Sequence, residues 1–301
     1  MYDIIIVGAG PAGLTAALYA RRANKSVLVL EQSTFGGQVT FSPQIENYPG
    51  FLKMSGNEFI DKLVDQVIEQ GAEIDLKTVT GIVDNGETKT VVTTRGEFEA
   101  KAVILATGVK HRETGLPGED KLVGHGISYC AVCDGAFFRN KTVAVLGGGN
   151  SALQEAVLLS DLADKIYIIQ DLDFLTGEAK LVEKIESKDN VEVITGSLLS
   201  GLIGDDVLTG VEITRKSDSS KSVINVDGLF VAIGLIPDND KFANVAFLDD
   251  YGYFNSDESC LTGTQGVFVA GDCRKKRIRQ ITTASADGAV AALAACRYID
   301  N

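Results

Sequence analysis

The sequence predicts an α/β protein of two Rossmann-like dinucleotide-binding domains, each a three-layer ββα sandwich, with the second domain inserted into the first. Two observations lead there: a strand, glycine turn, helix and strand open the chain, and the same unit returns in the middle, each time followed by β-rich segments. With 301 residues, of which 45% are hydrophobic, the chain can build two cores.

The first unit has an apolar strand at 2–7, the turn GAGPAG at 8–13, a helix at 14–23 and a strand at 26–31. Glycines in this dinucleotide fingerprint permit a tight turn and a close approach of the pyrophosphate, which binds at the helix N-terminus. Glu31 ends the second strand, where an acidic residue binds ribose hydroxyls. The predicted site residues are Gly8, Gly10, Pro11, Ala12, Gly13 and Glu31.

The second unit has a strand at 142–146, the turn GGGNSA at 147–152, a helix to about 162 and a strand at 165–169. Glycine turns also end later apolar strands, and they gather where ligands bind in such folds. These turns add Ala106, Thr107, Gly108, Gly271 and Asp272 to the candidate site.

The C-terminal stretch, with a strand at 266–272 and a helix at 282–298, resembles the first half of the chain more than the second. We therefore expect the first domain at 1–112 and 244–301, and the inserted domain at 113–243.

Cys130 and Cys133 are separated by two residues in the motif CAVCDG. The two thiols are therefore close enough to bond to each other or to bind one metal ion. This spacing lowers the pKa of one thiol and lets the pair cycle between dithiol and disulfide. Zinc needs about four ligands, and no second close pair is present, so no metal site is predicted. Asp134 is a candidate acid or base. Cys260, Cys273 and Cys296 are expected to be small hydrophobic residues.

Charge and hydropathy exclude several classes of protein. The net charge of −13 disfavours binding to nucleic acid or anionic membranes. No apolar stretch approaches the roughly 18 residues of a membrane span, and the opening residues run into a strand without a basic leader. A cytoplasmic location is expected.

With these motifs, the chain resembles the low-molecular-weight thioredoxin reductases over its whole length. The resemblance rests on GAGPAG, GGQ (36–38), ENYPG (46–50), ATG, CAVCDG, GGGNSA, GVFVAGD and RQITTASADG (279–288), in the family order. It implies a homodimer whose domains rotate, with Cys133 facing the flavin, Cys130 attacking thioredoxin, and 137–139 near thioredoxin. It also implies that FAD contacts the first fingerprint, Glu31, Gly37, Gln38, Asn47, Asp272, Arg279, Gln280 and Ile281.

One stretch departs from the family. NADPH-dependent members have a basic H-R-R-x-x-x-R run after the second fingerprint, whereas residues 170–176 here read QDLDFLT. Losing two charge-assisted contacts at roughly 1.5–3 kcal/mol each weakens binding by on the order of 10² to 10⁴. NADPH is therefore disfavoured.

Two electron donors are compatible with the loss of the arginine run. Asp171, interpreted as the counterpart of Glu31, indicates NADH. The resemblance to flavin thioredoxin reductases that keep GGGNSA without the arginines indicates reduced ferredoxin, which is the donor we favour. Electron transfer from a plant-type ferredoxin to thioredoxin releases about 6 kcal/mol. A basic cluster at 274–279 is a candidate docking site for an acidic carrier.

Two other classes remain as alternatives. An NADH oxidase would not need its cysteines. A redox-sensing protein without catalysis is disfavoured because flavin and dithiol motifs occur in one chain.

Overall fold

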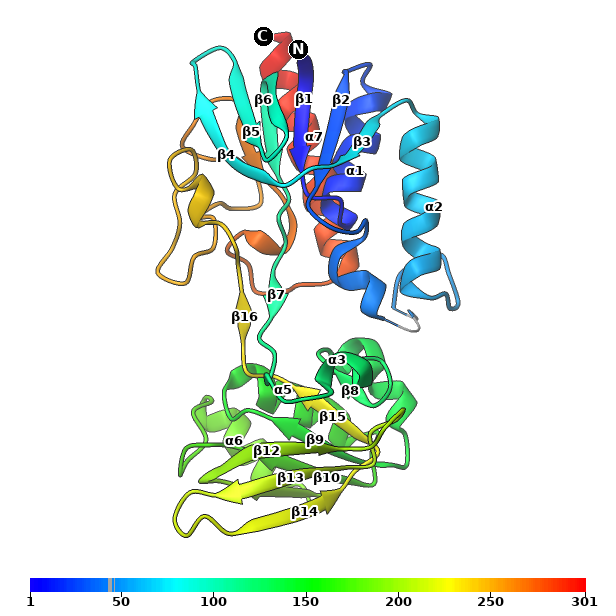
Figure 1. The fold of residues 1–301 in the computed structure, drawn as a ribbon, viewed down its shortest axis with the longest axis vertical. Coiled ribbons are helices and arrows are strands. Elements are labelled where there is room, and N and C mark those ends of the chain that lie inside the picture. The colour runs from blue at the N-terminus through cyan, green and yellow to red at the C-terminus, as the bar shows by residue number, and fades with distance from the viewer. Residues whose placement is uncertain (43–44, 46) are drawn as a thin grey trace. The chain divides into compact units, whose positions relative to one another are not determined.

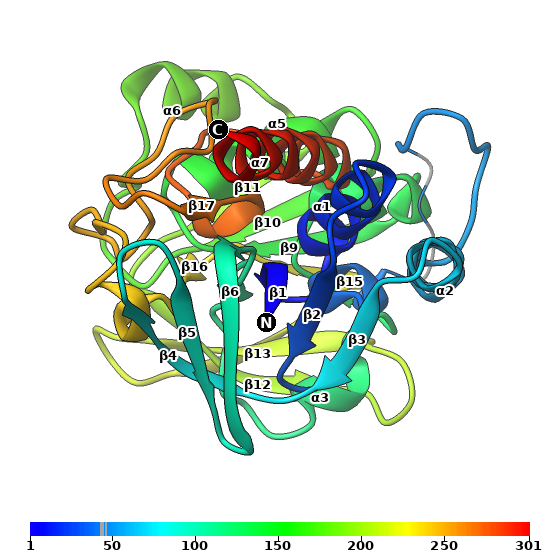
Figure 2. The same ribbon diagram turned by 90° about the horizontal axis from the view of Figure 1, so that it is seen from above.

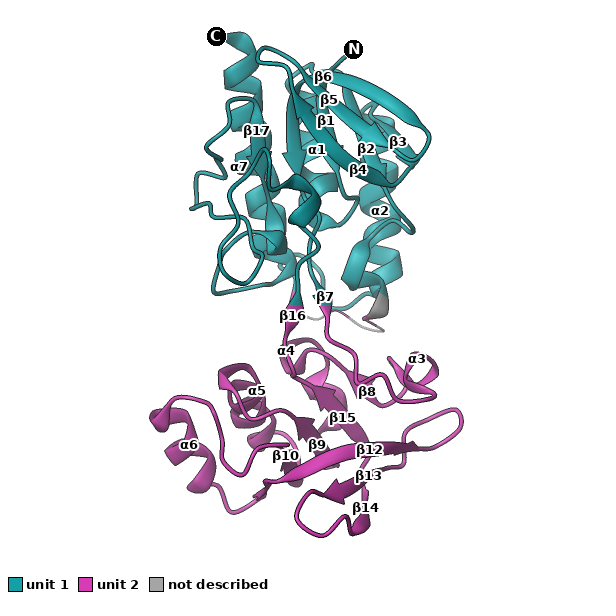
Figure 3. Ribbon diagram, turned by 60° about the vertical axis from the view of Figure 1, so that its left-hand side comes forward, with its two compact units in different colours: residues 1–40, 48–110, 236–301 teal, residues 41–47, 111–235 magenta. Residues whose placement is uncertain are grey.

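The computed structural model describes residues 1–42, 45 and 47–301, which form two compact units (Figure 3). Unit 1 comprises residues 1–40, 48–110 and 236–301, and unit 2 comprises 41–47 and 111–235. The chain passes between them at β7 (Lys110–His111) and β16 (Leu235–Ile236), which pair with each other. The second passage comes before residue 243 because Phe242 and Val245 are buried in the core of unit 1.

Unit 1 contains a seven-stranded sheet in the order β3-β2-β1-β6-β5-β4, with β17 also paired to β6 (Figure 1). Strands β1, β2, β3, β6 and β17 are mutually parallel, and β4, β5 and β6 form an antiparallel meander. The bounds are β1 (Tyr2–Val7), β2 (Val27–Glu31), β3 (Glu73–Leu76), β4 (Val79–Asp84), β5 (Lys89–Thr93), β6 (Gly96–Leu105) and β17 (Val267–Val269).

The helices of unit 1 include α1 (Pro11–Arg22) and α7 (Ile281–Asp300), which lie side by side (Figure 2). Gly288 permits this contact, because a Cβ there would lie 2.1 Å from the Ala12 carbonyl oxygen. The remaining helical elements are α2 (Gly56–Glu69), η1 (Gly37–Phe41), η3 (Asp240–Phe242) and η4 (Gly271–Cys273).

Unit 2 has three layers. A parallel sheet in the order β11-β10-β9-β15-β8 lies between helices and an antiparallel β12-β13-β14 meander. Alternation along β9 explains the layering, because Val143 and Val145 pack with helix residues while Ala144 packs with the meander. The strands are β8 (Ile127–Ser128), β9 (Thr142–Leu146), β10 (Lys165–Ile169), β11 (Val191–Ile194), β12 (Ser197–Ile203), β13 (Gly210–Arg215), β14 (Lys221–Asn225) and β15 (Gly228–Val231). The helices are α3 (Glu119–Leu122), α4 (Ala131–Asp134), η2 (Gly135–Phe138), α5 (Asn150–Ser160) and α6 (Ala179–Glu186).

This architecture confirms the predicted α/β class with two Rossmann-like units. The first helix begins at Pro11 rather than at residue 14. Proline is well suited to the first turn of a helix, because backbone N–H groups in that turn form no hydrogen bond within the helix. Within the described part of the chain, no helix has both the length and the apolar character required to cross a membrane.

Candidate active site

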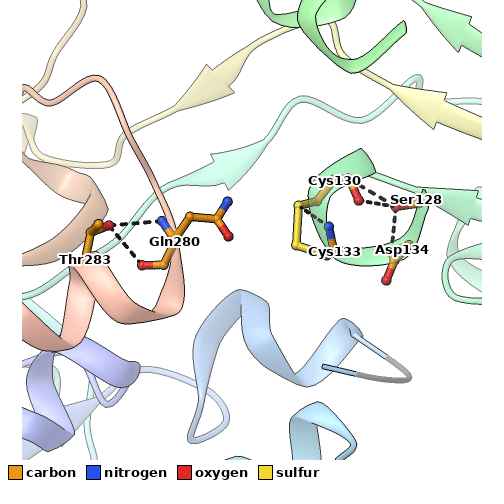
Figure 4. The surroundings of a disulfide bond; sticks show 6 residues. All are labelled: Ser128, Cys130, Cys133, Asp134, Gln280 and Thr283. Atoms are coloured by element: carbon orange, nitrogen blue, oxygen red, sulfur yellow. Dashed lines mark hydrogen bonds between the residues drawn. A yellow bond between two sulfur atoms is a disulfide. The ribbon is translucent and has the colours of Figure 1, made fainter. Parts of the chain in front are cut away.

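Cys130 and Cys133 are joined by a disulfide at α4 in unit 2 (Figure 4). Cys130 caps the helix, and the backbone N–H of Cys133 donates to its Sγ at 3.2 Å. Both cysteines are half-buried, whereas Val132 between them is exposed. The structure therefore places a partly accessible sulfur pair at a helix start, with a hydrogen-bond donor directed at one sulfur.

Asp134 follows the pair and is buried beside Ser128. The Ser128 hydroxyl donates to Asp134 Oδ2 at 2.6 Å and accepts from the Cys130 N–H at 3.1 Å. Among the described residues, Asp134 Oδ1 has no hydrogen-bond partner. Burial raises the pKa of Asp134, and the Ser128 hydrogen bond acts in the opposite direction. Asp134 thus has the environment of a carboxyl group that retains its proton more readily than usual.

The other cysteines are free and buried in unit 1. Burial raises the pKa of Cys260 to about 12, and it also raises the pKa values of Cys273 and Cys296. They remain protonated thiols at neutral pH, as expected of small hydrophobic residues. Phe138, which the family resemblance placed near thioredoxin, lies instead in the core of unit 2 against Phe230.

The first glycine turn shows two kinds of glycine. Gly8 has a φ of +108°, and a Cβ there would lie 2.3 Å from the Ala106 carbonyl oxygen; a Cβ at Gly13 would lie 1.9 Å from the Gly8 oxygen. These two glycines are needed for packing. Gly10 has a φ of −80°, and the atom nearest to its Cβ position is the Gly36 oxygen at 4.0 Å. The space above Gly10 is open, as required for a ligand that approaches the backbone.

Several predicted segments meet around this turn. Gly36 N donates to the Ala9 oxygen, Ala106 N donates to the Val7 oxygen, and a Cβ at Gly271 would lie 2.8 Å from Ala12 Cβ. A pocket begins here at the carboxyl ends of β1 and β2. Its lining includes Val7, Gly8, Leu30, Glu31, Thr107 and Gly108, and also Lys77, which the sequence analysis missed because no motif surrounds it.

Two carboxylates of unit 1 belong to this region. Glu31 Oε2 accepts from the Ala9 N–H at 2.9 Å, so the acid is fixed beside the glycine turn. Asp272 has a buried Oδ1 without a hydrogen-bond partner among the described residues. Burial raises the pKa of Asp272 to about 6, while Lys276 and Arg279 lower it. An acceptor left without a donor beside an open glycine turn fits a bound dinucleotide with hydroxyl groups.

The remaining predicted cofactor-binding residues fall into two groups, one at the start of α7 and one that is exposed. Arg279 donates to the Asp272 carbonyl oxygen and lies over the Tyr253 ring at 4.4 Å. Gln280 is the N-cap of α7 and forms a capping box with Thr283 (Figure 4), and Ile281 is the first residue of that helix. Gly37, Gln38 and Asn47 are exposed, and Glu46 of the ENYPG motif lies outside the described residues.

The second glycine turn has the same backbone form but an amide in place of the acid. Gly147 N donates to the Ile169 oxygen as Gly8 N donates to the Leu30 oxygen, so the counterpart of Glu31 is Gln170. The interpretation of Asp171 as that counterpart is therefore wrong. Asp171 comes one residue later, beyond the end of β10, and is exposed.

The segment after β10 folds back onto this turn. Thr176 N and Gly177 N donate to the Gly148 oxygen at 2.8 and 3.0 Å. The Gln170 side chain is buried, and a Cβ at Gly148 would lie 2.6 Å from it. Lys216 Nζ donates to the Asp171 carbonyl oxygen at 2.9 Å, which places one cation at the segment.

The basic cluster at 274–279 is partly paired within unit 1. Arg274 is buried and paired with Asp287 and Glu258, and Lys276 is paired with Asp287. Lys275 and Arg277 are exposed. Asp287 and Glu258 together offset two of the five positive charges that the sequence places at 274–279.

The fold and the cysteine pair define a disulfide oxidoreductase, and comparison with known proteins agrees. Residues 2–288 match the pyridine nucleotide-disulphide oxidoreductase family, to which the chain belongs. It is 41% identical over 301 residues to a thioredoxin reductase of Listeria monocytogenes, covering all of this chain and 94% of the relative.

Solved structures give the same assignment. The structure matches that of thioredoxin reductase from Streptococcus pyogenes with a TM-score of 0.94 at 38% identity, covering 100% and 98% of the two chains. The chain is thus a member of the low-molecular-weight thioredoxin reductases, a family for which FAD is the expected cofactor.

The comparisons do not support the ferredoxin-dependent subtype. A ferredoxin-flavin thioredoxin reductase from Clostridium acetobutylicum is 31% identical, with a TM-score of 0.53 and coverage of 98% and 97%. The relatives with higher identity are named as thioredoxin reductases without that qualification.

Proposed function

We propose that this chain reduces the disulfide of thioredoxin through FAD and the Cys130/Cys133 pair, acting as a homodimer in the cytoplasm. The observation that carries the proposal is the disulfide of a half-buried cysteine pair next to a buried carboxyl, in a chain whose other unit holds a dinucleotide-type glycine turn. The thioredoxin reductase relatives cover the chain from end to end and support it.

Unit 1, which contains most of the proposed FAD-binding domain at 1–112 and 244–301, would hold FAD. The pyrophosphate would approach Gly10 and the start of α1, the ribose would bind Glu31, and the unpartnered Asp272 Oδ1 would accept from a hydroxyl of the cofactor. When bound, FAD supplies electrons for the reduction of a disulfide. Unit 2, which contains most of the proposed second domain at 113–243, would present the cysteines.

The residues of the chain then perform disulfide exchange. The Cys130 thiolate bonds to one sulfur of the thioredoxin disulfide, the disulfide breaks, and the leaving sulfur takes a proton from Asp134. The Cys133 thiol then returns a proton to Asp134 and attacks Cys130 Sγ, which breaks the mixed disulfide between Cys130 and thioredoxin. The thioredoxin sulfur released in this step takes the proton from Asp134. Two electrons pass from the cysteine pair to thioredoxin, and one proton from solvent restores Asp134.

Ferredoxin is the donor we propose. Residues 170–176 carry no arginine or lysine, and the buried Gln170 amide stands where a ribose-binding carboxylate would stand. The relatives of higher identity weigh toward a nicotinamide, and Lys216 beside Asp171 is a cation that would favour one. NADH is therefore the alternative donor, and an NADH oxidase is the alternative activity.

Turnover with thioredoxin tests the proposal. FAD-loaded protein, photoreduced ferredoxin and oxidised thioredoxin are incubated without oxygen, and free thiols are counted by alkylation and mass spectrometry. Catalytic appearance of thioredoxin dithiol is expected. Thioredoxin that stays oxidised would contradict the proposal, and peroxide formed from NADH by the same protein in a parallel aerated sample would support the oxidase.

A further inference from the structure

A buried asparagine side chain joins two turns of the proposed FAD site in unit 1. Asn239 is the N-cap of η3, shortly after the chain returns from unit 2 at β16, and it is only 1% exposed. Its Oδ1 accepts from Thr107 Oγ1 at 2.7 Å. Its Nδ2 donates to the backbone oxygens of Gly252 and Cys273, at 2.9 and 3.1 Å. One side chain thus bonds to three segments that lie far apart in the sequence.

The orientation of this amide follows from the chemistry of its neighbours. Backbone carbonyl oxygens only accept hydrogen bonds, so the amide nitrogen, which carries two N–H donors, must face the oxygens of Gly252 and Cys273. The amide oxygen then faces Thr107, whose hydroxyl is the donor. Aspartate would bring no donor to this position, and leucine would bring neither a donor nor an acceptor. The site therefore requires a side-chain amide.

Both turns that Asn239 joins belong to the proposed FAD site. Thr107 and Gly108 line the pocket at the carboxyl ends of β1 and β2. Cys273 directly follows Asp272, whose buried Oδ1 has no hydrogen-bond partner within the described ranges of the chain. Asn239 consequently links the turn that lines the pocket to the turn that carries the free acceptor.

The Cys273 sulfur also contacts both turns, but through weaker bonds. Its thiol donates to the Leu105 oxygen at 3.5 Å. Burial raises the pKa of this thiol, and hydrogen bonds from Thr107 and Gly108 lower it. Sulfur is a weak donor and a weak acceptor, whereas the three hydrogen bonds of Asn239 have the lengths of ordinary N–H and O–H bonds. The sulfur makes the two turns neighbours, and the amide fixes their spacing.

We propose that Asn239 is a positioning residue for the cofactor: by fixing the spacing between Thr107 and Asp272, it holds the pocket wall and the free carboxylate oxygen where FAD can contact both. The inference rests on the proposed function only in that unit 1 binds FAD, and it does not depend on the electron donor or on thioredoxin. Asn239 itself does not touch the cofactor in this account. The sequence analysis assigned position 239 to the inserted domain, and the structure brings it to unit 1.

The test measures FAD binding to the cofactor-free protein and needs no turnover. FAD is removed from each variant, urea denaturation checks that the protein is folded, and flavin fluorescence gives the dissociation constant of FAD. Asn239→Ala leaves the Thr107 hydroxyl and the Gly252 oxygen without this partner. We expect its dissociation constant for FAD to rise about tenfold, which is the effect of about one net hydrogen bond.

A pair of substitutions at Thr107 isolates the hydrogen bond to the amide. Thr107→Val keeps the shape of the side chain but removes the hydroxyl, and it should weaken FAD binding about threefold to tenfold. Thr107→Ser keeps the hydroxyl and should restore the affinity to within about twofold of the wild type. Because Thr107 acts through Asn239 in this account, the double variant Thr107→Val/Asn239→Ala should bind FAD no more weakly than Asn239→Ala alone.

Asn244→Ala is the matched control for the loss of an amide from the same segment. The Nδ2 of Asn244 donates to the Ile82 oxygen at 2.7 Å, on β4 rather than on either turn of the proposed site. This variant should keep the wild-type affinity for FAD, whatever its stability in urea. A loss of affinity in Asn239→Ala that Asn244→Ala does not share is thus specific to the two turns.

The outcomes separate the role of Asn239 from the proposed function. Unchanged FAD affinity in folded Asn239→Ala, or a double variant whose loss equals both single losses combined, would overturn the role of Asn239. If Asn239→Ala does not fold, the Thr107 pair decides: weak binding in Thr107→Val with wild-type binding in Thr107→Ser supports the role, and equal binding in the two contradicts it. A wild-type protein that binds no FAD would contradict the proposed function as well.

Discussion

The two glycine turns of this molecule have the same backbone and different neighbours. Gly10 and Gly149 both cap a helix in extended conformation, with φ of −80° and −87°. In unit 1 the turn is surrounded by Glu31, the Thr107 segment and the unpartnered Asp272. In unit 2 the segment 171–178 folds onto the turn and an amide replaces the acid.

The comparison shows that a glycine fingerprint specifies a backbone turn and leaves the side chains around it open. In unit 2 the disulfide lies at α4 and not at the glycine turn. The following changes test this comparison, beginning with the largest expected effect.

Replacing a cysteine should abolish activity, whereas altering the second glycine turn should not. Cys133→Ser is expected to lower thioredoxin reduction by on the order of 10³-fold or more, because the exchange cannot be completed without the second thiol. The matched change is Gly149→Ala, where the atom nearest to the new Cβ is Thr176 Oγ1 at 3.7 Å. Ferredoxin-driven turnover should stay near the wild-type value in Gly149→Ala. A large loss there would place a nicotinamide at the second turn.

The turn that carries Asp272, beside the first glycine turn, depends on one buried carboxylate. Asp287 pairs with Arg274 and Lys276 and accepts from Gly271 N, which fixes the turn that carries Asp272. Asp287→Asn leaves the buried Arg274 with only the exposed Glu258 as a charged partner and removes the partner of Lys276, so it should cost about 3–5 kcal/mol in the free energy of unfolding. Urea denaturation measures this cost. Glu258→Gln, at the exposed end of the same network, should cost less than about 1 kcal/mol.

Gly10→Ala is the direct counterpart of Gly149→Ala. Among the described residues the atom nearest to its Cβ is the Gly36 oxygen at 4.0 Å, an ordinary contact, so unfolding should be unchanged, but the methyl group fills the space that the pyrophosphate would use. We expect FAD to dissociate at least about tenfold more readily, which corresponds to about 1.4 kcal/mol. Equilibrium dialysis with flavin fluorescence gives the result, and unaltered FAD binding would place the cofactor elsewhere.

The last prediction is a pH dependence of the stability of unit 1 without cofactor. The pKa of Asp272, about 6, lies above its ordinary value of 3.8. Its contribution to stability is thus fully present below about pH 4 and is lost as the pH rises through 6, by on the order of 2–3 kcal/mol. Asp272→Asn should remove this dependence in urea titrations of FAD-free protein, and the exposed Asp250→Asn should retain it.

Local sequence patterns predicted most of the fold. The strands at 2–7, 142–146 and 165–169 occur as predicted, because their apolar runs end in glycine turns that permit few other structures. The cysteine pair was equally visible, since both sulfurs lie in one short motif.

Other features depend on contacts between distant residues. Gly135 meets Leu159 only through the packing of the cysteine turn on α5, and the pairing of Arg274 with Asp287 crosses from a loop to α7. The end of β10 decides whether Gln170 or Asp171 faces the glycine turn, and a shift of one residue cannot be read from an apolar run.

Flavin reduction tests the central claim most directly. FAD-loaded protein is observed near 450 nm without oxygen while photoreduced ferredoxin, NADH or NADPH is added with oxidised thioredoxin. The account predicts rapid bleaching by ferredoxin alone, with catalytic reduction of thioredoxin. Rapid bleaching by NADH or NADPH would contradict it and make the second glycine turn a working nicotinamide site.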